Sequence, residues 1–142
     1  MIATLRQRDF RLAWLGGLIS MMGDWVLFIA LPIYIYQLTD STLATSGMFV
    51  AGLLPALLLG SVAGVFVDRW DRKRTMIVCN LILAVILLPL LALRSADWVW
   101  IAYVVSFVRS VVSLFFRPAE NAFLPRLVAE EDLLAANSLN AF

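Results

Sequence analysis

The chain has 142 residues, of which 63% are hydrophobic and 15% are charged, and its formal net charge at pH 7 is +1. Soluble domains are roughly 45–50% apolar and about 25% charged. This composition excludes a water-soluble domain, because much of the apolar surface would have to face water. The mean hydropathy of +0.92 therefore predicts an all-α membrane protein.

Few residues offer the chemistry of an active site or a metal site. Cys79 is the only cysteine, so no intrachain disulfide can form, and the chain has no histidine. No group of cysteines or carboxylates has the spacing of metal ligands. We therefore expect no catalytic residues, no metal and no cofactor, and we do not expect an enzyme. The small net charge gives no reason to expect a nucleic-acid partner.

The first apolar segment, 12–38, follows a short lead-in that contains three arginines. It is too long for the apolar region of a signal peptide, and Asp24 interrupts it, so we interpret it as a retained helix. Crossing about 30 Å of hydrocarbon takes about 20 apolar residues. The segment is long enough to tilt in a bilayer, and Pro32 is expected to bend it.

Three more apolar segments of spanning length follow, at 43–67, 75–93 and 98–116. The polar turn 39–42 joins the first two spans, and 94–97 joins the last two. Connections this short force neighbouring helices to run antiparallel. The sequence therefore predicts four antiparallel transmembrane helices.

Lysine and arginine are unevenly divided between the two sides of these spans. Nine lie on the side of the N-terminus and of the link between the second and third spans, and only Arg94 lies on the other. Basic residues gather in cytoplasmic loops. We therefore expect a multi-pass protein of the cell (inner) membrane with a cytoplasmic N-terminus. Aromatic anchors are then expected at the outer interface: Trp98, Trp100 and Tyr103.

The last part of the chain indicates a longer bundle. Pro118 is expected to close the fourth span or to bend its last turn. Three acidic residues, 130–132, precede an apolar run, which is typical of a helix start because acids complement the positive end of the helix dipole. This fifth helix would begin near residue 133 and has no room to finish. We therefore expect 1–142 to be part of a larger bundle whose other helices, with the lipid bilayer, are its partners.

The densest charge cluster is the link between the second and third spans, 64–74, which we call the hinge. Asp68 falls where the second helix ends, and there it opposes the negative end of its own helix dipole, at a cost of roughly a few tenths of a kcal/mol unless a partner compensates. Asp71 is well placed to cap the third helix. Without any further function, the cluster is also explained by basic residues that keep this loop in the cytoplasm and an aspartate that caps the third helix.

Asp24 and Arg109 are the two ionisable residues deep within apolar spans. Each costs at least about 2.5–3.5 kcal/mol at a helix centre, so both are functional candidates. At 1.5 Å per residue, both lie about 14 Å from the inner face, and an ion pair is therefore expected. Small or polar residues share the face of each: Gly16 and Ser20 with Asp24, and Ser106, Ser110 and Ser113 with Arg109.

Two interpretations of this pair stay open. Asp24 and Arg109 could form a static structural pair. Alternatively, Asp24 takes up and releases protons, Arg109 biases that titration, and a substrate competes with Arg109 for Asp24. In both cases the polar faces are expected to point into the bundle.

The hinge sequence resembles the motif between helices 2 and 3 of the major facilitator superfamily. Members of that family have twelve helices in two halves, with the substrate in a central cavity, and the resemblance implies that the hinge is a cytoplasmic latch. Asp71 departs from the pattern, because the family usually has glycine there. Arg109 is similar to the arginine of a fourth-helix motif in proton-driven antiporters, although the glycine that normally follows is absent. The matching hinge residues are Gly64, Asp68, Arg69, Arg72, Lys73 and Arg74.

The segments 117–122 and 133–140 resemble bacterial exporters of the enterobactin and macrolide type. This resemblance implies a secondary active transporter that admits protons and exports a drug, a siderophore or a similar bulky small molecule. Its partners would be the proton and that substrate. Two other classes stay open, a small four-helix drug/proton antiporter that works as a dimer and a non-transporting membrane scaffold.

Overall fold

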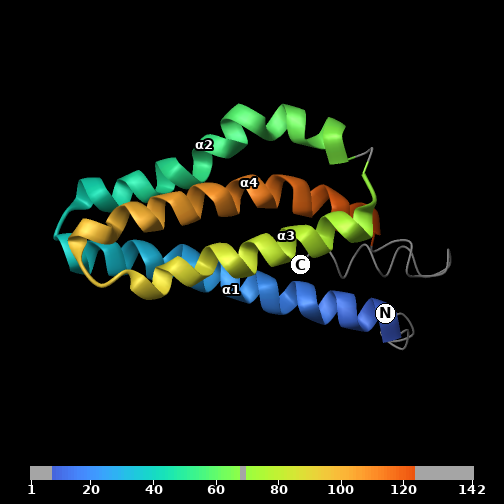
Figure 1. Cartoon of the computed structure of the whole chain (residues 1–142), viewed down its shortest axis with the longest axis horizontal. Helices are drawn as coiled ribbons and strands as arrows, with labels where there is room; N and C mark the ends of the chain where they lie inside the picture. The colour runs from blue at the N-terminus through green and yellow to red at the C-terminus, as the bar shows by residue number, and fades with distance from the viewer. Residues whose placement is uncertain (1–7, 68–69, 124–142) are drawn as a thin grey trace.

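The computed structural model describes residues 8–67 and 70–123, which are almost entirely helical (Figure 1). Two short 3₁₀ helices, η2 (Leu88–Ala92) and η3 (Ala96–Trp98), join the third long helix to the fourth. Within these two ranges four helices are long and apolar enough to cross a membrane, which confirms the predicted fold class. The predicted fifth helix lies outside the described residues. The long helices are α1 (Arg8–Thr39), α2 (Thr42–Val67), α3 (Arg72–Leu87) and α4 (Val99–Phe123).

The helices run antiparallel, so their connections lie at two ends of the bundle (Figure 1). The end with the start of α1, the hinge and the end of α4 is called the hinge end, and the opposite end is called the far end. The central helix is α4, which packs on both α2 and α3, while α1 packs mainly on α2. Accordingly, 28% of the spanning window in α4 is buried within the chain, against 6% of that in α1.

A tight turn joins α1 to α2 at the far end. Asp40 has a φ of 49°, in the left-handed region that aspartate tolerates better than most residues, and its N–H donates to the Tyr36 carbonyl at 2.8 Å. Ser41 then caps α2, because its Oγ accepts from the Ala44 N–H at 3.2 Å. The predicted short polar turn is therefore confirmed.

Buried apolar side chains from α1, α2, α4 and the α3–α4 link form a core cluster at the far end. Tyr34 Oη donates to the Leu93 carbonyl at 2.8 Å, and Tyr103 Oη donates to the Ala44 carbonyl at 2.7 Å. The Tyr103 ring packs over Gly47 of α2, and its expected role as an interfacial anchor stays a prediction. This cluster consists of Ile35, Met48, Leu93, Val99 and Ala102, and further buried apolar residues, among them Val112 and Ala119, lie along α4.

The third and fourth spans differ from the prediction near prolines. The expected span 75–93 divides into α3, which ends at Leu87, and η2, which contains Pro89, because proline removes an N–H donor and crowds the preceding turn. The span expected to end at 116 instead continues through Pro118 to Phe123. Pro55 lies inside α2, which changes direction part-way along its length (Figure 1).

Candidate functional site

Asp24 of α1 and Arg109 of α4 meet within the apolar part of the bundle. Arg109 Nε lies 3.4 Å from Asp24 Oδ1, and the two side chains are 25% and 43% exposed, respectively, within the described chain. The helices α1 and α4 otherwise have few contacts with each other, so this pair is a principal link between them. The predicted ion pair is therefore present, and its role is taken up below as a proposal.

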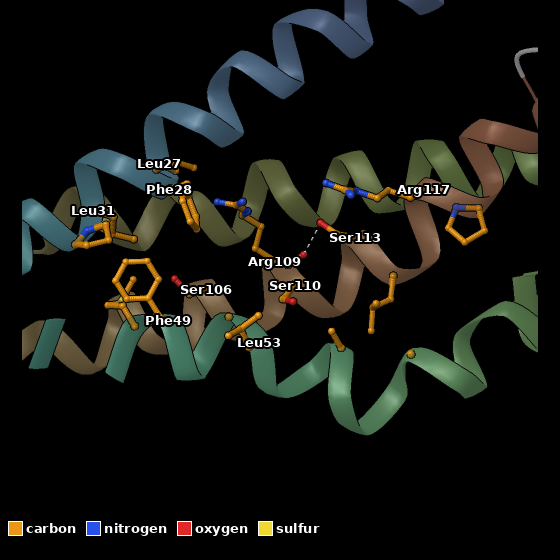
Figure 2. A pocket seen from close by; sticks show the side chains of 17 residues that line it. Leu27, Phe28, Leu31, Phe49, Leu53, Ser106, Arg109, Ser110, Ser113 and Arg117 are labelled. Carbon is orange, nitrogen blue, oxygen red and sulfur yellow. Dashed lines mark hydrogen bonds between the residues drawn. The ribbon is translucent and has the colours of Figure 1, made fainter. Parts of the chain in front are cut away.

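A cavity of about 630 Å³ lies between α1, α2 and α4 (Figure 2). Pockets for drug-sized ligands occupy roughly 300–1,000 Å³, so the cavity is large enough for a bulky small molecule. One wall is apolar and comes from α1 and α2, with side chains that include Leu27, Phe28, Leu31, Phe49 and Leu53. The other wall is polar and comes from α4, with Ser106, Arg109, Ser110, Ser113 and Arg117.

Aromatic rings form part of the apolar wall. Phe28 of α1 and Phe49 of α2 meet edge to face, with their centroids 5.8 Å apart and their planes at 79°. Trp25 adds a second edge-to-face contact to Phe28, at 6.0 Å. Such geometry is favoured by the ring quadrupoles. Phe28 and Phe49 therefore join α1 to α2 and present an apolar surface to the cavity.

The polar wall follows one face of α4, because its members recur at intervals of three and four residues. Ser113 Oγ donates to the Arg109 carbonyl at 2.9 Å (Figure 2). Ser106 and Ser110 form no hydrogen bond with any residue that the structure describes, so their hydroxyls are available to a ligand. The prediction that the polar faces point into the bundle is confirmed for this stripe, whereas Gly16 and Ser20 of α1 are exposed within the described chain.

The start of α3 shows how part of the hinge is built. Asp71 Oδ1 accepts from the Arg74 N–H at 2.8 Å, which confirms the predicted cap. Arg72 Nη1 donates to the Ala122 carbonyl at 3.1 Å, while Lys73 and Arg74 are exposed. Gly64 is placed within α2. Asp68 and Arg69 lie outside the described residues, so the latch expected at Asp68 stays a prediction.

A second contact attaches the hinge to α4. The Trp70 ring stacks on that of Phe115, with centroids 5.9 Å apart and planes 20° from parallel. Together with the bond from Arg72 to the Ala122 carbonyl, this stack fixes the end of the hinge against the last turns of α4. The helix that carries Arg109 therefore also carries the attachment of the hinge.

Glu120 of α4 marks a further contact with α1, nearer the hinge end than the ion pair. A Cβ on Gly17 would lie 3.1 Å from Glu120 Oε1, so a side chain larger than that of alanine would displace the carboxylate. Sequence reasoning missed both Gly17 and the two phenylalanines of the cavity. Nothing in a predominantly apolar helix distinguishes such residues from those that face lipid.

The whole chain, residues 1–142, matches the protein family described as transmembrane secretion effector. It is also 33% identical over 124 residues to YfiS of Bacillus subtilis, named an uncharacterized MFS-type transporter. The chain belongs to the major facilitator superfamily. It is similar to macrolide efflux protein A of Streptococcus pyogenes, at 36% identity over 126 residues, and to the putative bacilysin exporter BacE of Bacillus subtilis, at 32% over 126 residues.

The alignment with YfiS covers 87% of this chain, that with the macrolide efflux protein 87%, and that with BacE 89%. They cover only 29%, 31% and 31% of the respective relatives, so the chain spans about a third of their length. Among solved structures, no significant match was found. The predicted resemblance to the N-terminal portion of a major facilitator transporter is thus confirmed, and the protein is a multi-pass membrane protein. Family membership also counts against the small four-helix antiporter.

Proposed function

We propose that the complete protein is a secondary active transporter that exports a bulky small molecule in exchange for protons, and that this chain supplies part of its N-terminal half. One observation carries the proposal. An ion pair joins two apolar helices directly beside a cavity of drug-molecule size. The names of the relatives, a macrolide efflux protein and a putative bacilysin exporter, support export as the direction.

Protonation of Asp24 would couple proton movement to the shape of the bundle. While Asp24 is ionised it attracts Arg109, and a proton on the carboxylate removes that attraction. The contact between α1 and α4 would then weaken beside the cavity. Transporters of this type rock one half against the other about a site near the bilayer midplane, and the protonation state of Asp24 would bias that equilibrium.

The hinge end would face the cytoplasm, because it collects the basic residues. Trp70 and Arg72 attach the hinge to the end of α4, so a shift of α4 would reach the hinge directly. In this scheme α4 connects the Asp24–Arg109 pair to the latch that the family resemblance assigns to Asp68.

The first test replaces Asp24 by asparagine in the full-length protein, reconstituted in vesicles with an imposed pH gradient. Transport of a panel of fluorescent amphiphiles is measured. Asp24→Asn retains the shape of the side chain but cannot be ionised, so we expect proton-driven transport to fall at least about a hundredfold, the lower end of the usual contribution of proton transfer by a positioned group. Asp40→Asn is the matched control, because asparagine also tolerates a left-handed backbone. Unchanged transport in Asp24→Asn would refute the proposal.

A second variant separates coupling from a static structural pair. Removing one partner leaves a charge unpaired in the bundle, whereas Asp24→Asn combined with Arg109→Gln leaves none. If the pair is only structural, this double variant recovers both stability and transport. If Asp24 carries the proton, the double variant recovers stability while proton-driven transport stays lost. Absence of transport in the wild-type protein, with normal insertion, would favour a scaffold.

A further inference from the structure

We propose that the cavity between α1, α2 and α4 selects amphipathic organic anions, and that Arg117 binds their acidic group. The inference rests on the proposed transport function and names the substrate class of that site. The ligand would carry an aromatic or aliphatic body at one end and a carboxylate, sulfonate or phosphate at the other. We infer this substrate class from where the charged side chains lie around the cavity, not from their total charge.

The ionisable side chains that line the cavity are Arg109 and Arg117. Asp24 counters the charge of Arg109 at 3.4 Å. Arg117 forms no salt bridge with any residue in the described ranges. The Glu120 carboxylate, one turn further along α4, interacts with Arg117 electrostatically but lies against Gly17 of α1 and does not line the cavity. The hinge-end half of the cavity therefore presents a positive group that a ligand can engage.

The shape of the cavity sets where the rest of the ligand lies. Arg109 and Arg117 are eight residues apart, which places them about 12 Å apart along α4, and Figure 2 shows both side chains extending along the same side of the cavity. An acid held at Arg117 leaves that length for an apolar body directed towards Phe28 and Phe49. The free hydroxyl of Ser110 lies between the two ends.

Arginine suits this role because its planar guanidinium matches the two oxygens of a carboxylate or a phosphate. A ligand with a protonated amine at the same end would instead meet a like charge. The cavity would therefore rank compounds of equal size in the order acid, neutral, amine. A basic drug would bind poorly at this end of the cavity.

Three probes with one apolar body test this order: 1-pyrenebutyrate, 1-pyrenebutanol and 1-pyrenebutylamine. Their binding to the full-length protein in phosphatidylcholine vesicles is read from energy transfer between tryptophan and pyrene, with protein-free vesicles as the reference. We expect the acid to bind at least about tenfold more tightly than the amine, since a hydrogen bond to a charged group contributes on that scale. Arg117→Gln should remove the preference, and Arg117→Lys should retain part of it.

Arg94→Gln is the matched control, because Arg94 is exposed in the α3–α4 link at the far end and should leave the order unchanged. Tighter binding of the amine to the wild-type protein, or an acid preference that survives Arg117→Gln, would overturn the inference. So would displacement of pyrenebutyrate by phosphatidylglycerol but not by soluble organic acids, which would assign the site to a lipid headgroup. If Arg117→Gln does not fold, the wild-type order and Arg117→Lys decide.

The two proposals fail in different ways. No acid preference, together with proton-driven transport that depends on Asp24, overturns the anion inference alone. An acid preference that depends on Arg117, without transport of any probe by the wild-type protein, overturns the transport proposal alone.

Discussion

The pair formed by Asp24 and Arg109 shows how charge is tolerated inside an apolar helix bundle. Each residue alone would cost at least about 2.5–3.5 kcal/mol at a helix centre. Pairing at 3.4 Å offsets part of that cost, but a pair of apolar residues would carry no such cost at all. Stability alone therefore gives no reason for these residue types, whereas the proposed proton exchange beside the cavity would.

Substitutions at Gly17 test how closely α1 approaches α4, because Gly17 contacts Glu120 of α4. In Gly17→Ala the new methyl would lie 3.1 Å from Glu120 Oε1, but this oxygen ends a flexible side chain and can move. Alanine is also favoured over glycine in a helix by about 1 kcal/mol, so we expect Gly17→Ala to retain stability. Gly17→Leu should overpack the contact and lower stability by about 1–3 kcal/mol, measured by denaturation of the full-length protein.

Gly16→Leu is the matched control for that series, because no atom of the described residues lies within 4 Å of a Cβ at Gly16. Combining Gly17→Leu with Glu120→Ala should recover part of the lost stability, since it removes the group that the leucine meets. Equal stability of Gly17→Leu and Gly16→Leu would show that α1 and α4 are not in close contact there.

Sequence reasoning located some of these side chains and missed others for a physical reason. Asp24 and Arg109 could be matched because a charge is rare in an apolar span, and because span boundaries convert to depth at 1.5 Å per residue. The positions of the serines on the face of Arg109 were predicted from helical periodicity. Phe28 and Phe49 gave no such signal, since apolar residues occur on every face of α1 and α2.

The start of α3 shows how the hinge keeps a defined helix beginning although Asp71 replaces the glycine usual in the family. Asp71→Ala removes the acceptor of the Arg74 N–H and should cost about 1 kcal/mol of stability, whereas Asp71→Gly should cost only a few tenths of a kcal/mol. Hydrogen exchange at the Arg74 amide should rise more in Asp71→Ala than in Asp71→Gly. Ser41→Ala, which removes the cap of α2, is the comparison.

Equal effects of Asp71→Ala and Asp71→Gly at that amide would contradict this account. The carboxylate would then act through its charge in the hinge rather than through its hydrogen bond. A change at Arg74 in Ser41→Ala would show that the assay reports general destabilisation, because Ser41 lies at the far end of the bundle.

The ends of the helices were harder to predict than their existence. Proline always removes one hydrogen-bond donor, but whether the helix then ends depends on what holds the next turn. After Pro89 the chain tightens into η2 and turns into the link. After Pro118 the helix continues, and Arg72 binds the Ala122 carbonyl in its last turn. Local sequence does not predict these tertiary contacts, so it does not predict where each helix ends.

The bundle as a whole is held differently at its two ends. The far end contains the core and two tyrosine hydroxyls that cross between segments 59 residues apart in sequence. At the hinge end α4 is attached through Trp70 and Arg72, and the cavity extends past Arg117 to Pro118. This arrangement places a firmly packed end opposite one that holds the cavity and the hinge.

Variants at the two ends should therefore behave differently. Tyr103→Phe removes a hydrogen bond in the core region and should lower the free energy of unfolding by about 0.5–1.5 kcal/mol, with faster amide exchange in the first turns of α2. Phe115→Leu removes the ring that stacks on Trp70. It should speed exchange at the start of α3 and reduce proton-driven transport while changing global stability less than Tyr103→Phe does, because the core cluster lies at the far end.

Tyr36→Phe is the control for Tyr103→Phe, since the Tyr36 hydroxyl bonds no residue that the structure describes. Hydrogen exchange of the full-length protein, followed by mass spectrometry, distinguishes the two patterns. If Phe115→Leu lowers global stability as much as Tyr103→Phe does, the two ends are one cooperative unit and the hinge cannot move without the core. If it speeds exchange in α3 yet leaves transport intact, the attachment of the hinge to α4 is structural, and the route from Asp24 to the hinge does not pass through it.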